Sequence, residues 1–240
     1  MTPIQDALEK IIAAQQQQKR PLAVILAGHN GSGKSTMWYT QLADTLQMPL
    51  INADRMMLSI LPETPLPEWA VHIRDTHEDW MKVAQKGVEA FVAQAMEKQV
   101  PFAMETVFSH WADLGNGKFE SKIDKIHQLQ GQGYFVLLLF VGLTNFSLSI
   151  ARVQKRVADK GHDVPIEKLI KRFSRTQQAI RHAAEIADAS IFVDNSRAKN
   201  LAFTLCRVQM GKNISFDLRG KGASPIPPEI ETWMSVVCPH

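Results

Sequence analysis

The sequence predicts an α/β fold, with a mostly parallel sheet and helices on both faces. Short apolar runs alternate with segments of helical periodicity, which is the pattern of parallel strands joined by crossover helices. The expected strands are residues 22–27, 49–52, 101–105, 134–141 and 190–193. A glycine-rich segment directly follows the first of them. At 240 residues the chain can bury a substantial core, and we interpret it as one main domain over residues 21–220.

Residues 1–20 are expected to form an amphipathic helix and a linker before this domain. Thr2, Pro3 and Gln5 have the spacing of an N-cap, a first helical position and a capping-box partner. Apolar residues then recur on one helical face, at Ile4, Leu8, Ile11 and Ile12. The glutamine-rich stretch 15–20 is expected to link this helix to the first strand.

The segment after the first strand reads Gly-His-Asn-Gly-Ser-Gly-Lys-Ser-Thr and is a complete phosphate-binding loop. Its glycines let backbone N–H groups face a phosphate, and the following helix directs its positive end at the same anion. The motif predicts that Lys34 reaches the β- and γ-phosphates and that Ser35 is a ligand of Mg²⁺. It therefore predicts a P-loop NTPase fold that binds ATP or GTP with Mg²⁺. The expected nucleotide-binding residues are Gly28, His29, Asn30, Gly31, Ser32, Gly33, Lys34, Ser35 and Thr36.

Two carboxylates follow strands at the edge where a parallel sheet binds its ligand. Asp54 follows the second strand and lies near the γ-phosphate if this strand neighbours the P-loop strand. There it could accept the proton of an attacking hydroxyl, and the alternative is a helix cap. Glu105 ends the third strand, where it could hold Mg²⁺ through water, bind a polar substrate or face solvent.

Basic residues are dense over residues 152–175, which indicates a lid over the phosphates. They include Arg152, Lys155, Arg156, Lys160, Lys171, Arg172 and Arg175. Phosphoryl transfer spreads negative charge over the γ-phosphate oxygens, and arginines that close over the nucleotide stabilise it. A pair of solvated charged helices would explain the same density. His162 is expected to hydrogen-bond within its loop rather than to act as a base.

The remaining segments complete the expected fold. One helical stripe, whose aromatic members are expected in the core, carries Trp80, Ala84, Val88, Phe91, Ala95 and Met96. Asp194 and Asn195 follow the last parallel strand, where either a nucleotide base site or a simple turn explains them. Residues 205–210 and 214–218 flank a turn and predict a β-hairpin. Residues 221–240 are expected to form an irregular C-terminal tail.

The composition argues against several classes of partner. The formal net charge of +3, from 27 basic and 24 acidic residues, is too mild for general attraction to nucleic acid or membranes. Cys206 and Cys238 lack metal-ligand spacing and are expected to be reduced thiols. No stretch has the length of a membrane span, and residues 1–18 lack the pattern of a signal peptide. We therefore expect a cytoplasmic protein with neither a nucleic-acid nor a membrane partner.

Taken in order, the motifs resemble those of the zeta toxin family of P-loop kinases. They are Gly-His-Asn-Gly-Ser-Gly-Lys-Ser-Thr, Ile-Asn-Ala-Asp, Met-Glu-Thr, Phe-Val-Gly-Leu, Arg-Val, Gly-His-Asp-Val-Pro and Lys-Arg-Phe, within about residues 20–197. The resemblance is greatest to a compact bacterial branch whose members carry the label predicted ATPase. It implies a kinase for the 3′-hydroxyl of UDP-N-acetylglucosamine, a toxin that starves cell-wall synthesis, with a separate antitoxin protein as partner.

The resemblance also implies a role for each candidate residue. Lys34 and Ser35 would bind the phosphates and Mg²⁺, and Asp54 would be the catalytic base at the substrate hydroxyl. Arg156 and Arg172 would stabilise the transferring phosphoryl group.

The chain departs from the family's pattern at two places. Glu105 would contact the sugar, but Thr106 and Val107 follow it where the better-studied toxins have glycine and threonine. One hydroxyl contact to the substrate is therefore either shifted, with Thr106 as the candidate, or lost. The lid arginines are farther apart in sequence than in those toxins, so Arg152 or Arg175 could fill either role. The alternatives to a nucleotide-sugar kinase are a kinase of another metabolite hydroxyl and a nucleotide-dependent ATPase that switches a partner.

Overall fold

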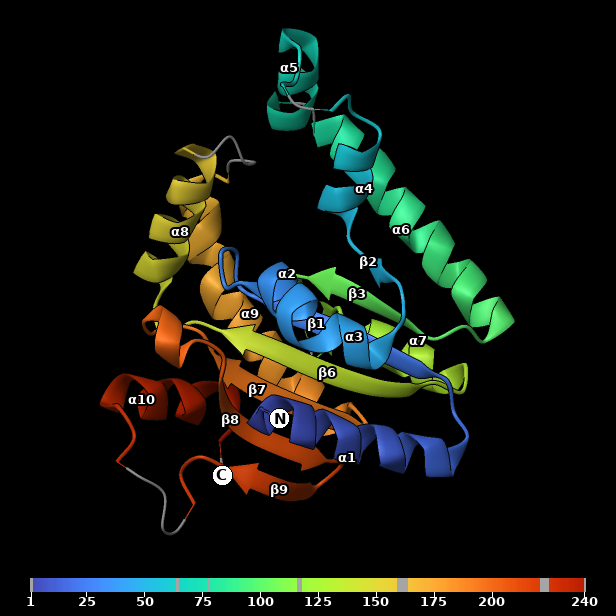
Figure 1. The fold of residues 1–240 in the computed structure, drawn as a ribbon, viewed down its shortest axis with the longest axis vertical. Coiled ribbons are helices and arrows are strands. Elements are labelled where there is room, and N and C mark those ends of the chain that lie inside the picture. The colour runs from blue at the N-terminus through green and yellow to red at the C-terminus, as the bar shows by residue number, and fades with distance from the viewer. Residues whose placement is uncertain are drawn as a thin grey trace.

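A seven-stranded sheet forms the centre of the molecule (Figure 1), in the strand order β2-β3-β1-β6-β7-β8-β9. The structure is a computed structural model, and it describes residues 2–63, 65–76, 78–115, 118–158, 164–220 and 225–239. The strands are β1 (Leu22–Gly28), β2 (Leu50–Ile51), β3 (Phe102–Thr106), β6 (Phe135–Gly142), β7 (Ala189–Asp194), β8 (Thr204–Met210) and β9 (Asn213–Asp217). The first five are parallel, whereas β8 and β9 add an antiparallel hairpin. The predicted mostly parallel α/β fold and the C-terminal hairpin are confirmed.

The strand order places β3, rather than β2, beside the P-loop strand β1. Ile25 of β1 pairs with Met104 of β3 on one side and with Leu138 of β6 on the other. β2 pairs with β3 and is the edge strand. The expectation that Asp54 follows a neighbour of the P-loop strand is therefore wrong, because the chain crosses to the sheet edge and then returns between the two strands.

One face of the sheet is covered by the N-terminal helix and the P-loop helix. They are α1 (Pro3–Gln18), α2 (Lys34–Met37), the π-helix η1 (Trp38–Leu42) and α3 (Ala43–Leu46). The predicted capping box is confirmed, since Thr2 Oγ1 accepts from Gln5 N–H and Gln5 Oε1 accepts from Thr2 N–H. Leu8 and Trp38 share one buried cluster with Val24 of β1, so α1 packs into the main core. The helix continues to Gln18, through most of the stretch that was expected to be a linker.

The other face is covered by helices from the second half of the chain and by one long earlier helix. They are α6 (Glu78–Lys98), α7 (Ile123–Gly131), α9 (Ile166–Ile186) and α10 (Pro228–Val237). The prediction of helices on both faces is confirmed, but the prediction of an irregular tail over residues 221–240 is wrong. Apolar residues of α10 recur at helical spacing and are buried, at Ile230, Trp233, Met234 and Val237. Pro228 opens this helix at a position that tolerates proline, so the proline-rich run precedes a helix and does not end the fold.

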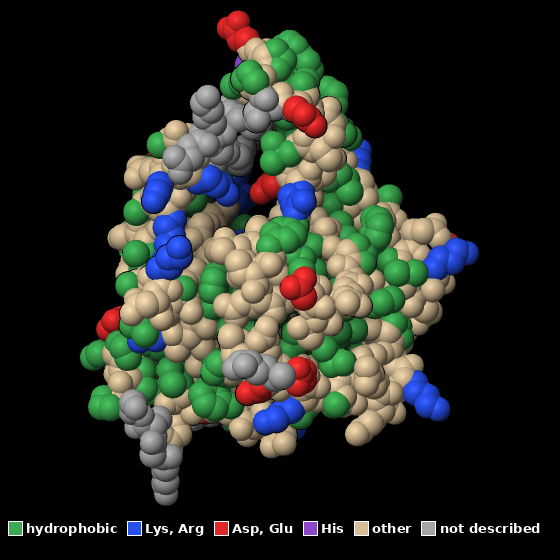
Figure 2. All heavy atoms as spheres, in the orientation of Figure 1, with side chains coloured by type: hydrophobic (Ala, Val, Ile, Leu, Met, Phe, Trp, Pro, Cys, Tyr) green, Lys and Arg blue, Asp and Glu red, His purple; other side chains and the backbone are tan. Residues whose placement is uncertain are grey.

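Two helical arms rise on either side of the P-loop (Figure 1). One contains α4 (Ala53–Ser59), α5 (Glu68–Thr76) and α6, and the other contains α8 (Phe146–Ala158) and α9. Figure 2 shows a hollow between the arms, with several Lys and Arg side chains on the α8 side. Trp80 and Phe91 of α6 are 39% and 40% exposed, so the prediction that they lie in the core is wrong. The arm presents these rings to solvent because only part of its surface packs on the sheet.

Further elements complete the described chain. A hairpin that the sequence did not reveal, β4 (Trp111–Gly115) with β5 (Lys118–Ser121), stacks Trp111 on His182 of α9 with ring centroids 5.1 Å apart. The short 3₁₀ helix η2 (Lys199–Leu201) precedes β8. Cys206 and Cys238 are buried free thiols, as expected. Within the described residues no helix has the length and apolarity needed to cross a membrane.

Candidate active site

The loop between β1 and α2 leaves no room for side chains at its glycines. A Cβ at Gly28 would overlap the Val141 carbonyl oxygen and lie 2.7 Å from Ser32 Oγ. Gly33 has a φ of 90° in the left-handed region, and a Cβ there would lie 2.7 Å from Asn195 Nδ2. A bare backbone at these positions lets N–H groups approach an anion closely, which is the predicted geometry of a phosphate cradle.

Lys34 lies at the start of α2 with its ammonium group inside the loop. Lys34 Nζ donates to the carbonyl oxygens of Gly28 at 3.0 Å and His29 at 3.1 Å, and lies 3.8 Å from Glu105 Oε1. Burial lowers the pKa of Lys34, and the carboxylates of Glu105 and Asp54 partly offset this effect. The loop therefore holds a buried cation against its own carbonyl oxygens.

Glu105 connects three elements at the carboxyl edge of the sheet. Its Oε2 accepts hydrogen bonds from Ser35 Oγ at 2.8 Å and from Asn52 Nδ2 at 2.7 Å. Ser35 comes from the P-loop helix and Asn52 from the end of β2, while Glu105 itself lies on β3. The structure thus brings Ser35 and Glu105, both predicted site residues, into direct contact. Their oxygens form a hard donor set of the kind that Mg²⁺ prefers.

Asp54 is exposed in the first turn of α4 and is not the cap of that helix. Asn52 Oδ1 accepts from the N–H groups of Asp54 at 2.8 Å and Arg55 at 3.3 Å, so Asn52 is the cap. The charge of Asp54 raises the pKa of both Lys34 and Arg172, which places the carboxylate between the P-loop and the α9 arm. The alternative interpretation of Asp54 as a helix cap is therefore wrong.

Helix α8 is tied to the P-loop by hydrogen bonds. Ser149 Oγ donates to the Asn30 carbonyl oxygen at 2.7 Å, and Arg152 Nη1 donates to the Gly31 carbonyl oxygen at 3.4 Å. The positive charge of Arg156, one turn after Arg152, lowers the pKa of Lys34. Arg152 therefore stabilises the loop by a hydrogen bond, and Arg156 lies on the same face of α8, near Lys34.

Helix α9 brings a second predicted arginine to the site. Burial lowers the pKa of Arg172, and the nearby Asp54 carboxylate raises it. Arg175 is exposed on the same helix. Lys160 and His162 lie outside the described residues. Within the described ranges, the predicted lid thus consists of two packed helices, with Arg156 on one and Arg172 on the other.

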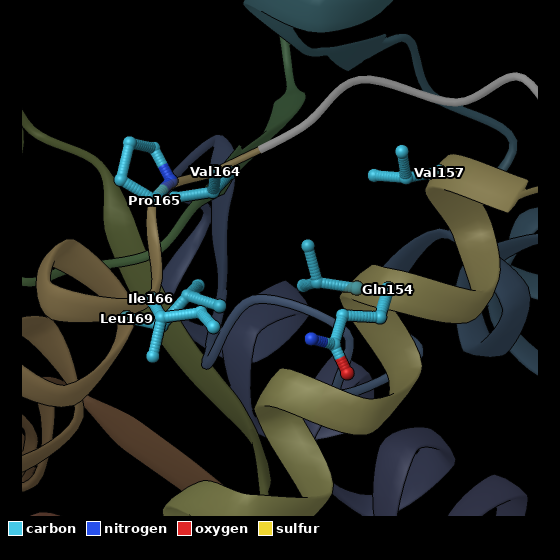
Figure 3. A pocket seen from close by; sticks show the side chains of 7 residues that line it. Gln154, Val157, Val164, Pro165, Ile166 and Leu169 are labelled. Atoms are coloured by element: carbon cyan, nitrogen blue, oxygen red, sulfur yellow. The ribbon is translucent and has the colours of Figure 1, made fainter.

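The two lid helices enclose a hollow of about 530 Å³, open solvent at its mouth included. It is lined by Val153, Gln154, Val157, Val164, Pro165, Ile166 and Leu169. Figure 3 shows the side chains of α8 and those before and within α9 on opposite sides of this gap. The lining is largely apolar and contains none of the phosphate-facing groups, so the hollow belongs to the packing of the lid and is not the catalytic centre.

Lys122 joins the site although the sequence gave no reason to select it. Its ammonium donates to Thr106 Oγ1 at 2.6 Å, and Phe108 N–H donates to the same oxygen at 3.1 Å. Burial and the charge of Arg172 lower the pKa of Lys122. Thr106, predicted to contact substrate, is itself buried and holds the Lys122 ammonium near the charge of Arg172. Lys122 lies between β5 and α7, and the hairpin β4–β5, which the sequence did not reveal, places it beside Thr106.

The segment that follows β7 is hydrogen-bonded to the P-loop. Asn195 Nδ2 donates to the Ser32 carbonyl oxygen at 2.8 Å, so the segment is more than a simple turn. Asp194 Oδ1 accepts from Ser196 N–H at 3.1 Å and from Ser196 Oγ at 2.6 Å, and burial raises the pKa of Asp194.

Comparisons with known proteins agree with this architecture. A family profile described as Zeta toxin matches residues 5–203. An uncharacterized protein of Haemophilus influenzae is 28% identical over 141 residues, which cover 58% of this chain and 84% of that protein.

Two solved structures are similar in fold. A crystal structure of AvrRxo1-ORF1 and ORF2 with ATP aligns with a TM-score of 0.61 at 12% identity, covering 98% of this chain and 70% of that one. A structure of the PezAT chromosomal toxin–antitoxin system of Streptococcus pneumoniae aligns with a TM-score of 0.53 at 14% identity, covering 98% and 88%. This chain therefore has the P-loop kinase fold that these two structures share. Since the profile spans most of the chain, the protein belongs to the zeta toxin family of ATP-dependent kinases.

Proposed function

We propose that the protein transfers the γ-phosphoryl group of ATP to a hydroxyl of a nucleotide sugar. The observation that carries the proposal is the convergence of a phosphate cradle, a carboxylate and lid arginines at one edge of the sheet. The Asp54 carboxylate raises the pKa of both Lys34 and Arg172, although the three residues come from three separate elements. Phosphoryl transfer requires this combination, because its catalysis consists mainly of positioning and charge stabilisation.

The residues of the cradle fit a nucleotide triphosphate with Mg²⁺. The crowded glycine positions fit a phosphate held by backbone N–H groups, and Lys34 supplies a buried cation beside them. Ser35 Oγ and the Glu105 carboxylate, 2.8 Å apart, are the groups that would hold Mg²⁺. The ion would neutralise charge on the β- and γ-phosphates. We place Glu105 on this metal side of the site, since its hydrogen bonds direct it to Ser35 and Asn52.

Asp54 is the proposed base that receives the proton of the acceptor hydroxyl. Its side chain is exposed, and it lies at a capped helix start that fixes its backbone. Arg172 of α9 lies near Asp54 and Arg156 of α8 lies near Lys34, and in this proposal the two arginines stabilise charge on the transferring group. A loose transition state needs little activation of the nucleophile, so correct placement of Asp54 is sufficient for its role.

The proposed acceptor is the 3′-hydroxyl of UDP-N-acetylglucosamine, and the proposed setting is the cytoplasm. Membership of the zeta toxin family supports this choice. The cationic pair Lys122 and Arg172 on the acceptor side also suits a substrate that carries phosphates. Because the PezAT structure is of a toxin–antitoxin system, we further propose that this protein is a toxin neutralised by a separate antitoxin.

The test is phosphorylation of a panel of acceptors with isotopically labelled ATP and Mg²⁺, resolved by mass spectrometry. The panel contains UDP-sugars, free nucleotides and unrelated metabolite alcohols. Asp54→Asn should reduce turnover by about 10²-fold or more while ATP still binds. Asp44→Asn, which removes an exposed carboxylate from α3, is the matched control and should retain activity.

Each outcome of the panel has a distinct meaning. A phosphate added to UDP-N-acetylglucosamine and lost with Asp54→Asn supports the full proposal. A phosphate added only to another alcohol retains the kinase and rejects the nucleotide sugar. Hydrolysis of ATP stimulated by a protein, without any phosphorylated acceptor, would replace the proposal with a nucleotide-dependent switch.

A further inference from the structure

His29, the second residue of the P-loop, turns its ring away from solvent and into the lid. The residue is only 2% exposed. The imidazole stacks on Phe173 of α9, with ring centroids 4.0 Å apart and planes at 15°. Phe140 of β6 meets it edge-on, with centroids 5.5 Å apart at 66°. The side chain is therefore an aromatic contact between the P-loop and α9 and does not extend into the cleft.

The hydrogen bonds of the ring define its tautomer. Leu143 N–H, just beyond the end of β6, donates to His29 Nδ1 at 3.2 Å. Because Nδ1 accepts, the proton of the neutral ring resides on Nε2. Nε2 has no hydrogen-bond partner among the described residues, and the nearby Phe173 backbone partly offsets the lowering of the pKa of the ring.

Burial and the neighbouring charge of Lys34 lower the pKa of His29 to about 3. The low pKa agrees with the hydrogen bond that Nδ1 accepts, and both indicate a neutral ring near pH 7. A purely apolar ring would fill the same space but would leave the Leu143 N–H without its acceptor. Histidine combines a flat ring for stacking with that acceptor.

The partner of this stack is adjacent to a predicted catalytic arginine. Phe173 follows Arg172 in sequence, and both residues line one small cavity together with His29. One turn later Thr176 Oγ1 donates to the Val107 carbonyl oxygen at 3.1 Å, beyond the end of β3. These two contacts fix α9 against the P-loop on one side and against the end of the Glu105 strand on the other.

We propose that His29 is a positioning residue, whose neutral imidazole clamps α9 onto the P-loop and so directs Arg172 toward the transferring phosphoryl group. This inference rests on the proposed function, because it assigns His29 an effect through Arg172. It departs from the expectation that His29 binds the nucleotide directly. The clamp makes the position of one lid helix depend on the conformation of the phosphate-binding loop.

The test combines kinetics with hydrogen–deuterium exchange. His29→Gln retains a side-chain acceptor for Leu143 N–H and loses the stack, whereas His29→Phe retains the ring and loses the acceptor. We expect His29→Gln to lower kcat by about 10–100-fold, as a displacement of roughly 1 Å would, with the KM for ATP changed less than about threefold. His29→Phe should retain most of kcat. Amide exchange in residues 166–186 should accelerate in His29→Gln and stay near wild type in His29→Phe.

A double-mutant cycle separates positioning from general packing. Arg172→Met lowers kcat on its own, and adding His29→Gln should lower it no further, since the clamp acts through the removed guanidinium. Multiplicative effects of the two substitutions would overturn the inference, as would unchanged kcat and unchanged exchange in His29→Gln. Thermal unfolding of each variant checks that kinetics are measured on folded protein.

Failure of the proposed function gives a different result. A wild-type protein that neither phosphorylates an acceptor nor hydrolyses ATP rejects the phosphotransferase and the role of the clamp in catalysis together. If the wild type is active and the His29 and Arg172 substitutions have multiplicative effects on kcat, the clamp alone is rejected.

Discussion

Adding one methyl group at Gly142 should separate helix α10 from the sheet. Gly142 ends β6, and a Cβ there would overlap the indole of Trp233, with Cε2 at 2.7 Å and Cη2 at 2.9 Å. Trp233 is 2% exposed and stacks on Phe140, with ring centroids 5.9 Å apart. The indole is a rigid ring and cannot relieve the overlap by rotation of a flexible side-chain end, so the α10 backbone must be displaced.

The size of the effect follows from these contacts. Ordinary van der Waals contact begins near 3.4 Å, so Cε2 must retreat by about 0.7 Å or more. Overpacking of this kind typically costs about 1–3 kcal/mol, and the rigid ring favours the upper end. Replacing Gly by Ala recovers about 0.4–1 kcal/mol from the unfolded chain. The net loss is about 2 kcal/mol, which lowers Tm by roughly 4–8 °C for a chain of this size.

Trp233→Ala provides the comparison. Alone it should cost about 3–5 kcal/mol, because it leaves a large cavity between α10 and the sheet. With the indole absent, the added methyl group has nothing to displace, so Gly142→Ala should add no further cost in the double variant. Urea unfolding followed by circular dichroism, with calorimetry for Tm, measures the four proteins of the cycle. Equal losses from Gly142→Ala in the presence and absence of Trp233 would refute the reasoning.

Three further predictions concern the site. His29 binds a proton below about pH 6.5 in the unfolded state but only below about pH 3 in the folded state. Its contribution to the free energy of unfolding is therefore complete above pH 6.5 and falls as the pH is lowered toward 3. Between pH 7 and pH 5 the free energy of unfolding, measured with urea, should fall by about 2 kcal/mol from this residue, and this fall should be absent in His29→Phe. An equal dependence of the unfolding free energy on pH in both proteins would contradict the burial of a neutral imidazole. Glu105→Gln should raise the Mg²⁺ concentration for half-maximal activity by about 10–100-fold, as measured by a titration of turnover with Mg²⁺. An unchanged midpoint of this titration would reject the role of Glu105 in binding the metal. Lys122→Met should raise the KM for the nucleotide sugar roughly tenfold or more and leave the KM for ATP unchanged. The control Lys125→Met, in the helix that follows, should change neither KM. An equal KM for the nucleotide sugar in the two variants would exclude Lys122 from acceptor binding.

The sequence was sufficient for features that depend on local pattern. The apolar runs became the five parallel strands, and the spacing of Gly28, Gly33 and Lys34 located the loop whose glycines are crowded and whose lysine is buried in the structure. The capping box at Thr2 and the C-terminal hairpin also followed from neighbouring residues alone.

Features that depend on distant packing were not accessible in the same way. Strand order is a property of the whole sheet, so the sequence could not show that β3 separates β2 from β1. Lys122 reaches the site because the β4–β5 hairpin and Thr106 place it there, and neither contact leaves a local signal. Trp80 and Trp233 both lie on apolar helical stripes, yet one is exposed and the other buried, because Trp233 packs where Gly142 leaves room for its indole.

Asn52 uses both ends of a single amide at the centre of this site. Its Nδ2 donates to Glu105 while its Oδ1 holds the first turn of α4, so the amide has one permitted orientation. A displacement of the Glu105 carboxylate is therefore passed directly to the helix that carries Asp54. The proposed base and the carboxylate proposed for the metal side are thus linked through one side chain. Aspartate at position 52 would keep the helix cap but set two carboxylates against each other, which would break the link at the Glu105 end.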